Sequence, residues 1–143
     1  MNSVKIINFK IYIALVILSL ILIITGIYYS RIQADDSLRV NLAGRQRMLS
    51  QKIVKEILLY KFGEISSDKI INSLKVFRET QDALISGGSA PLDLELKDYR
   101  DLPVTGDKES LNKLLAVKKM WMPVEKHAGE FISKKDDESL KHI

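Results

Sequence analysis

Cysteine is absent from this 143-residue chain, and histidine occurs only as His127 and His142. Without cysteine no disulfide can form, so packing alone must hold the fold, although the absence does not decide the redox compartment. Two histidines without cysteine do not make a metal-ligand set. The sequence therefore predicts no metal site and no cofactor.

Catalytic signatures are missing as well. No serine lies in a nucleophile-elbow sequence, and no glycine-rich phosphate loop opens a helix. The acid pairs Asp35-Asp36 and Asp136-Asp137 are adjacent in sequence, so on a helix their side chains diverge by about 100° and cannot share a proton. We therefore expect a protein that is not an enzyme.

A strong surplus of one charge is also missing. The chain has 22 Lys and Arg against 18 Asp and Glu, which gives a formal net charge of +4. Basic residues are interleaved with acids, whereas nucleic-acid-binding domains carry concentrated basic patches. We expect no nucleic-acid partner.

Charge is absent altogether from residues 11–29. A helix of this length covers roughly 29 Å, about the hydrocarbon thickness of a bilayer. A cleaved signal peptide is the competing interpretation, because the segment lies near the N-terminus behind Lys5 and Lys10. However, Tyr28 and Tyr29 stand where cleavage requires small side chains, and tyrosine is typical of membrane interfaces. We favour an uncleaved transmembrane helix in the lipid bilayer.

The charges around this segment predict its orientation. Residues 1–10 carry lysines without an acid, whereas Asp35 and Asp36 follow the segment closely. By the positive-inside rule, residues 1–10 are cytoplasmic and the chain after Ser30 is extracytoplasmic. We expect a single-pass protein of the inner (plasma) membrane with residues 30–133 as a periplasmic domain.

Helical periodicity governs the rest of the chain. The first helix is expected to run from about Ile11 to Phe62 without a break, and Gly63 is expected to end it. Ser66-Ser67-Asp68 is typical of the N-cap of a second helix, which Gly87-Gly88 terminates. The expected core side chains of the second helix are Ile70, Ile71, Leu74, Phe77, Leu84 and Ile85. Thr80, Gln81 and Asp82 could point toward a site, but a solvated turn is the favoured interpretation.

Residues 87–106 are expected to form a surface loop packed by its leucines. Leu92, Leu94 and Leu96 alternate with charged residues, a pattern that fits a short strand or an extended lid. A connection of this length is uncommon in a compact domain and is often functional.

Thr105 or Asp107 is expected to cap a third helix. Pro123 predicts a kink or a restart near Met120–Met122. Trp121 and its flanking methionines could line a binding pocket, but core packing is the favoured interpretation. The apolar side of this helix comprises Leu111, Leu114, Leu115, Trp121, Val124, Ala128 and Phe131. Residues 134–143 are expected to form a charged tail that frays or begins another helix.

The predicted fold class is all-α: an N-terminal transmembrane helix continues into an antiparallel helical bundle. Three helices are present in an arrangement that is four-helix-bundle-like. Three helices leave apolar surface uncovered, so we expect a homodimer or a helix from a receptor partner to cover it.

The stretch from Asp36 to Ile53 has two faces when it is drawn as a helix. One face carries the apolar residues Leu38, Leu42, Leu49, Ile53, Ile57 and Tyr60. The opposite face carries Ser37, Asn41, Gly44, Arg47, Gln51 and Lys55.

Gly44 makes a notch on the outward face that lets a second backbone come close. A two-fold axis at this point brings Arg47 near its own symmetry mate, and a small anion between the two guanidinium groups relieves their repulsion. The alternative is that Arg45, Arg47, Gln51 and Lys52 merely solvate an exposed helix face.

The run NLAGRQRMLSQ, from Asn41 to Gln51, closely resembles the signature of the PilJ-type, NarX-like sensor domain of type IV pilus methyl-accepting chemotaxis transducers. It is also similar to the periplasmic box Asn-x-Ala-Gly-x-x-Arg-Met-x-Ser of nitrate/nitrite sensor kinases. The matching positions here are Asn41, Ala43, Gly44, Arg47, Met48 and Ser50. In those kinases the glycine and the arginine line a nitrate site on the dimer axis. The resemblance implies these roles for Gly44 and Arg47.

Departures from the kinase box limit what the resemblance implies. Arg45-Gln46 and Leu49 follow the pilus-transducer version, whose ligand the motif does not fix. In the family a fourth helix, a second membrane span and a signalling module follow, so we expect a truncated receptor or a stand-alone sensor subunit.

The sequence therefore predicts a membrane-anchored sensor domain in signal transduction or chemotaxis. It is expected to bind a small, nitrate-like anion or another small ligand at Gly44 and Arg47, flanked by Asn41 and Gln51. The alternative is a ligand-free helical adaptor that pairs with a receptor or a pilus component.

Overall fold

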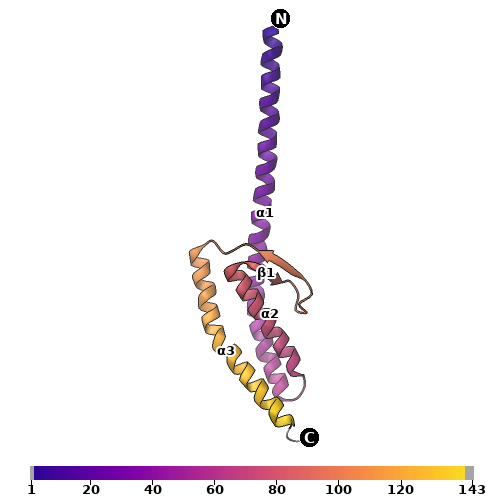
Figure 1. The fold of residues 1–143 in the computed structure, drawn as a ribbon, viewed down its shortest axis with the longest axis vertical. Helices are drawn as coiled ribbons and strands as arrows, with labels where there is room; N and C mark the ends of the chain where they lie inside the picture. Colours follow the sequence, from indigo (N-terminus) through magenta and orange to yellow (C-terminus); the bar gives the residue numbers. More distant parts are fainter. Residues whose placement is uncertain (1, 141–143) are drawn as a thin grey trace. The chain divides into compact units, whose positions relative to one another are not determined.

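The computed structural model describes the backbone of residues 2–140 and the side chains of residues 9–135. Its elements are α1 (Asn2–Lys61), α2 (Ser67–Ser86), β1 (Gly88–Pro91), β2 (Tyr99–Leu102) and α3 (Lys108–Leu140) (Figure 1). The predicted all-α class with three helices is confirmed, and a small strand pair is the one addition to it among the described residues.

The chain divides within α1 into two compact units, one up to Leu38 and one from Arg39 onward. In the first unit α1 begins at Asn2, earlier than the expected start near Ile11. Side chains of residues 9–34 are all exposed. The stretch Phe9–Lys61 contains a window that is long and apolar enough to cross a membrane, judged by length and composition.

In the second unit, side-chain bonds from α1 to α2 define the direction of these two helices. Gln46 on α1 donates to the Phe77 carbonyl, and Lys52, further along α1, donates to Ser73 at 2.7 Å. Positions that rise along α1 therefore pair with positions that fall along α2. The two helices are antiparallel, as predicted.

The pairing of α2 with α3 is antiparallel as well. Lys118 forms an ion pair of 2.7 Å with Asp82, whereas Glu125, further along α3, pairs with Arg78. The second unit is thus an up-down-up bundle in which α2 packs against both α1 and α3.

The core lies where the apolar faces of the three helices meet. The apolar face predicted for α1 is confirmed, because its side chains are buried or half-buried. The core cluster comprises Leu49, Ile53, Tyr60, Ile70, Leu74, Val76, Phe77, Ala128 and Ile132. Three residues expected on the apolar faces are instead exposed: Ile71 is 51 % exposed, Leu115 is 45 % exposed and Val124 is 38 % exposed.

The solvated turn expected at residues 80–82 is wrong. These residues lie within α2, and Thr80 and Gln81 are buried. Their polar groups are satisfied inside the bundle, because the Thr80 hydroxyl donates to the Val76 carbonyl and the Gln81 amide donates to the Leu114 carbonyl. Burial of polar side chains therefore depends on these bonds.

The connection between α2 and α3 is a hairpin rather than a plain loop. Strands β1 and β2 pair antiparallel, with Gly88 opposite Leu102 and Pro91 opposite Tyr99. The short strand considered for residues 92–97 is misplaced, because these residues form the turn between the strands. Leu96 packs against the core with a φ of 57°, a left-handed conformation that is uncommon for leucine.

Helix ends follow the predicted signals closely. Gly87 ends α2 with a φ of 74°, and a Cβ there would lie 2.9 Å from the Val104 nitrogen. Asp107, not Thr105, caps α3, because its carboxylate accepts the backbone N–H of Ser110 at 2.7 Å.

The extent of the last helix decides between alternatives that the sequence left open. It continues through Pro123 as one helix, so there is no restart there, and the predicted kink stays a prediction. Residues 134–140 do not begin another helix, since α3 continues to Leu140. Residues 141–143 lie outside the described residues.

Candidate functional site

The outward face of α1 carries the four residues predicted to bind a ligand. Asn41, Gly44, Arg47 and Gln51 are all exposed. A Cβ added to Gly44 would meet nothing within 4 Å. Their grouping on an exposed face agrees with the prediction, whereas ligand binding itself stays a prediction.

The Arg47 guanidinium differs from those of its neighbours in the bundle. Arg39, Arg45 and Arg78 each donate hydrogen bonds to other parts of the unit. Among the residues that the structure describes, the Arg47 side chain has no hydrogen-bond or ion-pair partner. A guanidinium with five free donors can bind an oxyanion in a bidentate manner.

Two large apolar side chains lie near this cation on the same helix, with exposed fractions of 72 % for Val40 and 69 % for Met48. Phe62, which follows the end of α1, is 75 % exposed. Such side chains gain free energy when another surface covers them.

Arg45 points the other way and ties the hairpin to α1. Its guanidinium donates to the Leu92 carbonyl at 2.7 Å, to the Pro91 carbonyl and to the Thr80 hydroxyl at 3.2 Å. Burial lowers the pKa of Arg45, and the nearby Asp93 carboxylate partly offsets this effect. The interpretation of Arg45 as a solvated surface residue is therefore wrong.

Arg39 makes a second tie at the other end of the connection. Its guanidinium donates to the Thr105 hydroxyl at 2.9 Å and to the Pro103 carbonyl. The Thr105 hydroxyl in turn donates to the Leu84 carbonyl at 2.6 Å. Arg39 and Arg45 thus hold both ends of the connection between α2 and α3.

Gln46 is the other inward residue of the motif, and its role was not predicted from the sequence. Its amide nitrogen donates to the Phe77 carbonyl at 3.0 Å. A signal for its direction, and for that of Arg45, was present. The two residues stand three and four positions after Leu42 and so fall on the buried face of α1.

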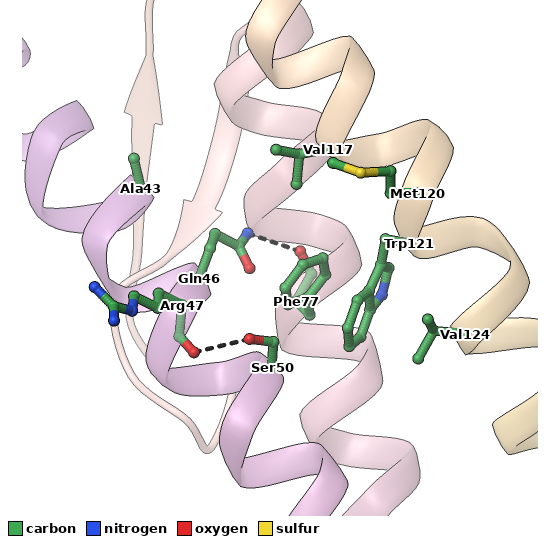
Figure 2. A pocket seen from close by; sticks show the side chains of 9 residues that line it. All are labelled: Ala43, Gln46, Arg47, Ser50, Phe77, Val117, Met120, Trp121 and Val124. Carbon is green, nitrogen blue, oxygen red and sulfur yellow. Dashed lines mark hydrogen bonds between the residues drawn. The ribbon is translucent and has the colours of Figure 1, made fainter.

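A cavity of about 440 Å³ opens beside Gln46, between α1 and α3 (Figure 2). Phe77 of α2 lies between the two walls. Arg47 lines the cavity as well, although its guanidinium points away from it. The remaining lining residues are Ala43, Ser50, Val117, Met120, Trp121 and Val124.

Trp121 serves both the core and this cavity. Its ring stacks on Phe77 with 4.0 Å between centroids and 24° between planes, and it also lines the cavity. Core packing and pocket lining were treated as alternatives in the sequence analysis, but here they coincide.

No group of three or more His, Asp or Glu side chains that could hold a metal ion occurs among the residues described. The candidate site has two parts: a free guanidinium on the outward face of α1 and an apolar cavity between α1 and α3.

Comparison with known proteins gives one positive finding. No curated protein and no solved structure matches the chain. The family model described as type IV pili methyl-accepting chemotaxis transducer N-term (PilJ) matches residues 28–142. This match covers the three-helix unit with its motif, and chemotaxis transducers are signalling proteins. The chain therefore belongs to the PilJ family of type IV pili methyl-accepting chemotaxis transducer N-terminal domains.

Proposed function

We propose that this chain is a membrane-anchored, extracytoplasmic sensor domain that binds a small anion at Arg47. Residues 11–29 span the inner membrane, residues 1–10 are cytoplasmic, and the bundle lies in the periplasm. The observation that carries the proposal is the exposed Arg47 guanidinium, which has no partner among the residues described.

A homodimer provides the second half of the proposed site. Gly44 has free space around it in its own chain, so the bundle does not need glycine there for packing. A helix from a second copy does benefit, because glycine allows close approach of backbones. Val40 and Met48 supply apolar contacts beside the axis, and a nitrate-like anion bridges the two copies of Arg47.

Signalling follows from the differential affinity of the anion for two arrangements of the helix pair. The anion favours the arrangement in which the two guanidinium groups converge, so binding shifts the population toward it. Asn41 and Gln51 flank the anion and orient it.

Calorimetry on the full chain tests the anion site. Nitrate and nitrite are titrated into the wild type, the Arg47→Ala variant and the Lys55→Ala variant, which removes another exposed cation from the same face. We expect saturable heat in the wild type and Lys55→Ala but not in Arg47→Ala. Equal heat in all three proteins, or none in any, contradicts the anion site.

A ligand-free adaptor is the second candidate function. The exposed Val40, Met48 and Phe62 favour it, because they can dock on a receptor or a pilus component without an anion. Co-purification separates the two candidates, since an adaptor retains its partner in the absence of any added small molecule.

A further inference from the structure

We propose that the cavity between α1 and α3 is a second ligand site, which accepts a flat apolar molecule bearing one hydroxyl or amide group. Arg47 borders both this cavity and the outward face of α1. Gln46 and Arg47 are neighbours in sequence, yet Gln46 faces the cavity and the Arg47 guanidinium points away from it (Figure 2).

The walls of the cavity define the apolar part of the ligand. Phe77 and Trp121 form a stacked aromatic surface, and Val117 and Val124 line the α3 side. Met120 is 68 % exposed at the rim, and an unbranched thioether adapts to ligands of different shape. The volume of about 440 Å³ lies within the usual range for small-molecule sites.

One buried polar atom defines the polar part. Gln46 is only 7 % exposed, and its Nε2 already donates to the Phe77 carbonyl, which fixes its Oε1 as the free end. This oxygen, an acceptor, has no hydrogen-bond partner among the described residues.

An unpaired buried acceptor beside a cavity selects for a ligand that can donate to it. A site that hydrogen-bonds a hydroxyl or an N–H discriminates against an analogue without that group. A hydroxyl or an amide N–H can donate to Gln46 Oε1. An entirely apolar ligand leaves this acceptor unpaired.

The probes are p-cresol and p-xylene, in which a methyl group replaces the hydroxyl. Trp121 is the single tryptophan of the chain and lines the cavity, so its fluorescence reports occupancy directly. Titration of the full chain is expected to give saturable binding, with p-cresol about tenfold tighter than p-xylene.

Three variants assign this preference to the cavity. In Gln46→Met, which keeps an unbranched side chain, p-cresol is expected to lose its advantage over p-xylene. Val117→Phe fills the cavity and is expected to weaken p-cresol binding about tenfold. Ala116→Phe adds the same bulk at the neighbouring exposed residue and is expected to leave binding unchanged. Because Val117 is 38 % exposed, its variant tests the site even where Gln46→Met does not fold.

Several outcomes overturn the proposal. The proposal is overturned if the two probes bind with equal affinity, if neither probe binds, or if Val117→Phe binds p-cresol as tightly as the wild type does. If neither probe binds and Val117→Phe changes the oligomeric state, a helix of a second copy covers the cavity. This outcome also overturns the proposal. Nitrate calorimetry reports the Arg47 site, whereas Trp121 fluorescence reports the cavity. Val117→Phe is expected to bind nitrate as the wild type does, so failure of the anion site and failure of this site are distinguishable.

Discussion

The Arg45 guanidinium on α1 donates a hydrogen bond of 2.7 Å to the backbone carbonyl of Leu92, 47 residues later in the chain. The same group donates to the Pro91 carbonyl and to Thr80 of α2. One side chain therefore fixes the hairpin to two helices at once. The next arginine of the motif, Arg47, has an exposed side chain.

The first prediction compares these two arginines. Arg45→Ala leaves two carbonyls without their charged donor, and we expect it to lower the free energy of unfolding by about 2–3 kcal/mol. Arg47→Ala, an exposed substitution, is expected to change it by less than about 0.5 kcal/mol. Denaturant unfolding followed by circular dichroism measures both. An equal loss of stability in the two variants contradicts the division of roles.

The same variant makes a local prediction about the hairpin. In Arg45→Ala, amide hydrogen exchange in β1 and β2 is expected to rise more than exchange in the core of α2, because the hairpin loses its tie to α1. Arg45→Lys keeps the charge but not the forked donor geometry. Its hydrogen exchange in β1 and β2 is therefore expected to lie between that of the wild type and that of Arg45→Ala. Uniform acceleration across all elements argues for global destabilisation instead.

Much of the bundle could be predicted from periodicity. Leu42, Leu49 and Ile53 recur at helical spacing and are buried, and Gly87 and Asp107 mark helix ends through local chemistry that the sequence displays. These features depend on neighbours a few residues away, so the sequence is sufficient to predict them.

Other features depend on contacts across the chain. The buried Thr80 hydroxyl bonds to the nearby Val76 carbonyl but also accepts from Arg45 of α1, 35 residues away, and no local pattern contains the second contact. The outward direction of Gly44 and Arg47 was predictable from helix geometry, but the cavity beside Gln46 requires α3 to lie next to α1.

A second pair of predictions concerns glycine. Gly87→Ala is expected to destabilise the protein, because its φ is 74° and the added Cβ would lie 2.9 Å from the Val104 nitrogen. Gly129→Ala, in α3 with free space around it, is expected to stabilise by about 0.5–1 kcal/mol. Thermal unfolding measures both, and a stabilising Gly87→Ala contradicts the close contact.

Gly44→Ala separates folding from association. The added methyl group meets nothing within its own chain, so we expect the bundle to be stabilised by about 0.5–1 kcal/mol. The proposed dimer is expected to weaken, because the methyl group keeps the two backbones apart. Sedimentation and thermal unfolding of the same samples measure the two effects, with Gly129→Ala as control. Unchanged association contradicts a dimer axis at Gly44.

The last prediction concerns acid stability at the turn of the hairpin and at the start of α3. The Ser110 hydroxyl and then its backbone N–H lower the pKa of Asp107 below its ordinary value of 3.8. The backbone N–H of Lys97 has the largest lowering effect on the pKa of Asp93. Both groups have a depressed pKa in the folded state. Their contribution to stability is therefore complete above pH 3.8 and is lost as the pH falls through the folded-state pKa.

Asparagine substitutions test this sign. Asparagine, like aspartate, caps helices and stabilises turns in which its side-chain oxygen accepts a backbone N–H. Asp107→Asn and Asp93→Asn are therefore expected to change stability little at neutral pH, but asparagine does not titrate. Each is expected to flatten the decline in unfolding free energy below about pH 4. Ser110→Ala removes the largest cause of the Asp107 shift, so it is expected to lower stability at neutral pH and to make the decline below about pH 4 shallower. If the unfolding free energy of Asp107→Asn falls as steeply with acid as that of the wild type, the Asp107 carboxylate does not contribute to acid unfolding.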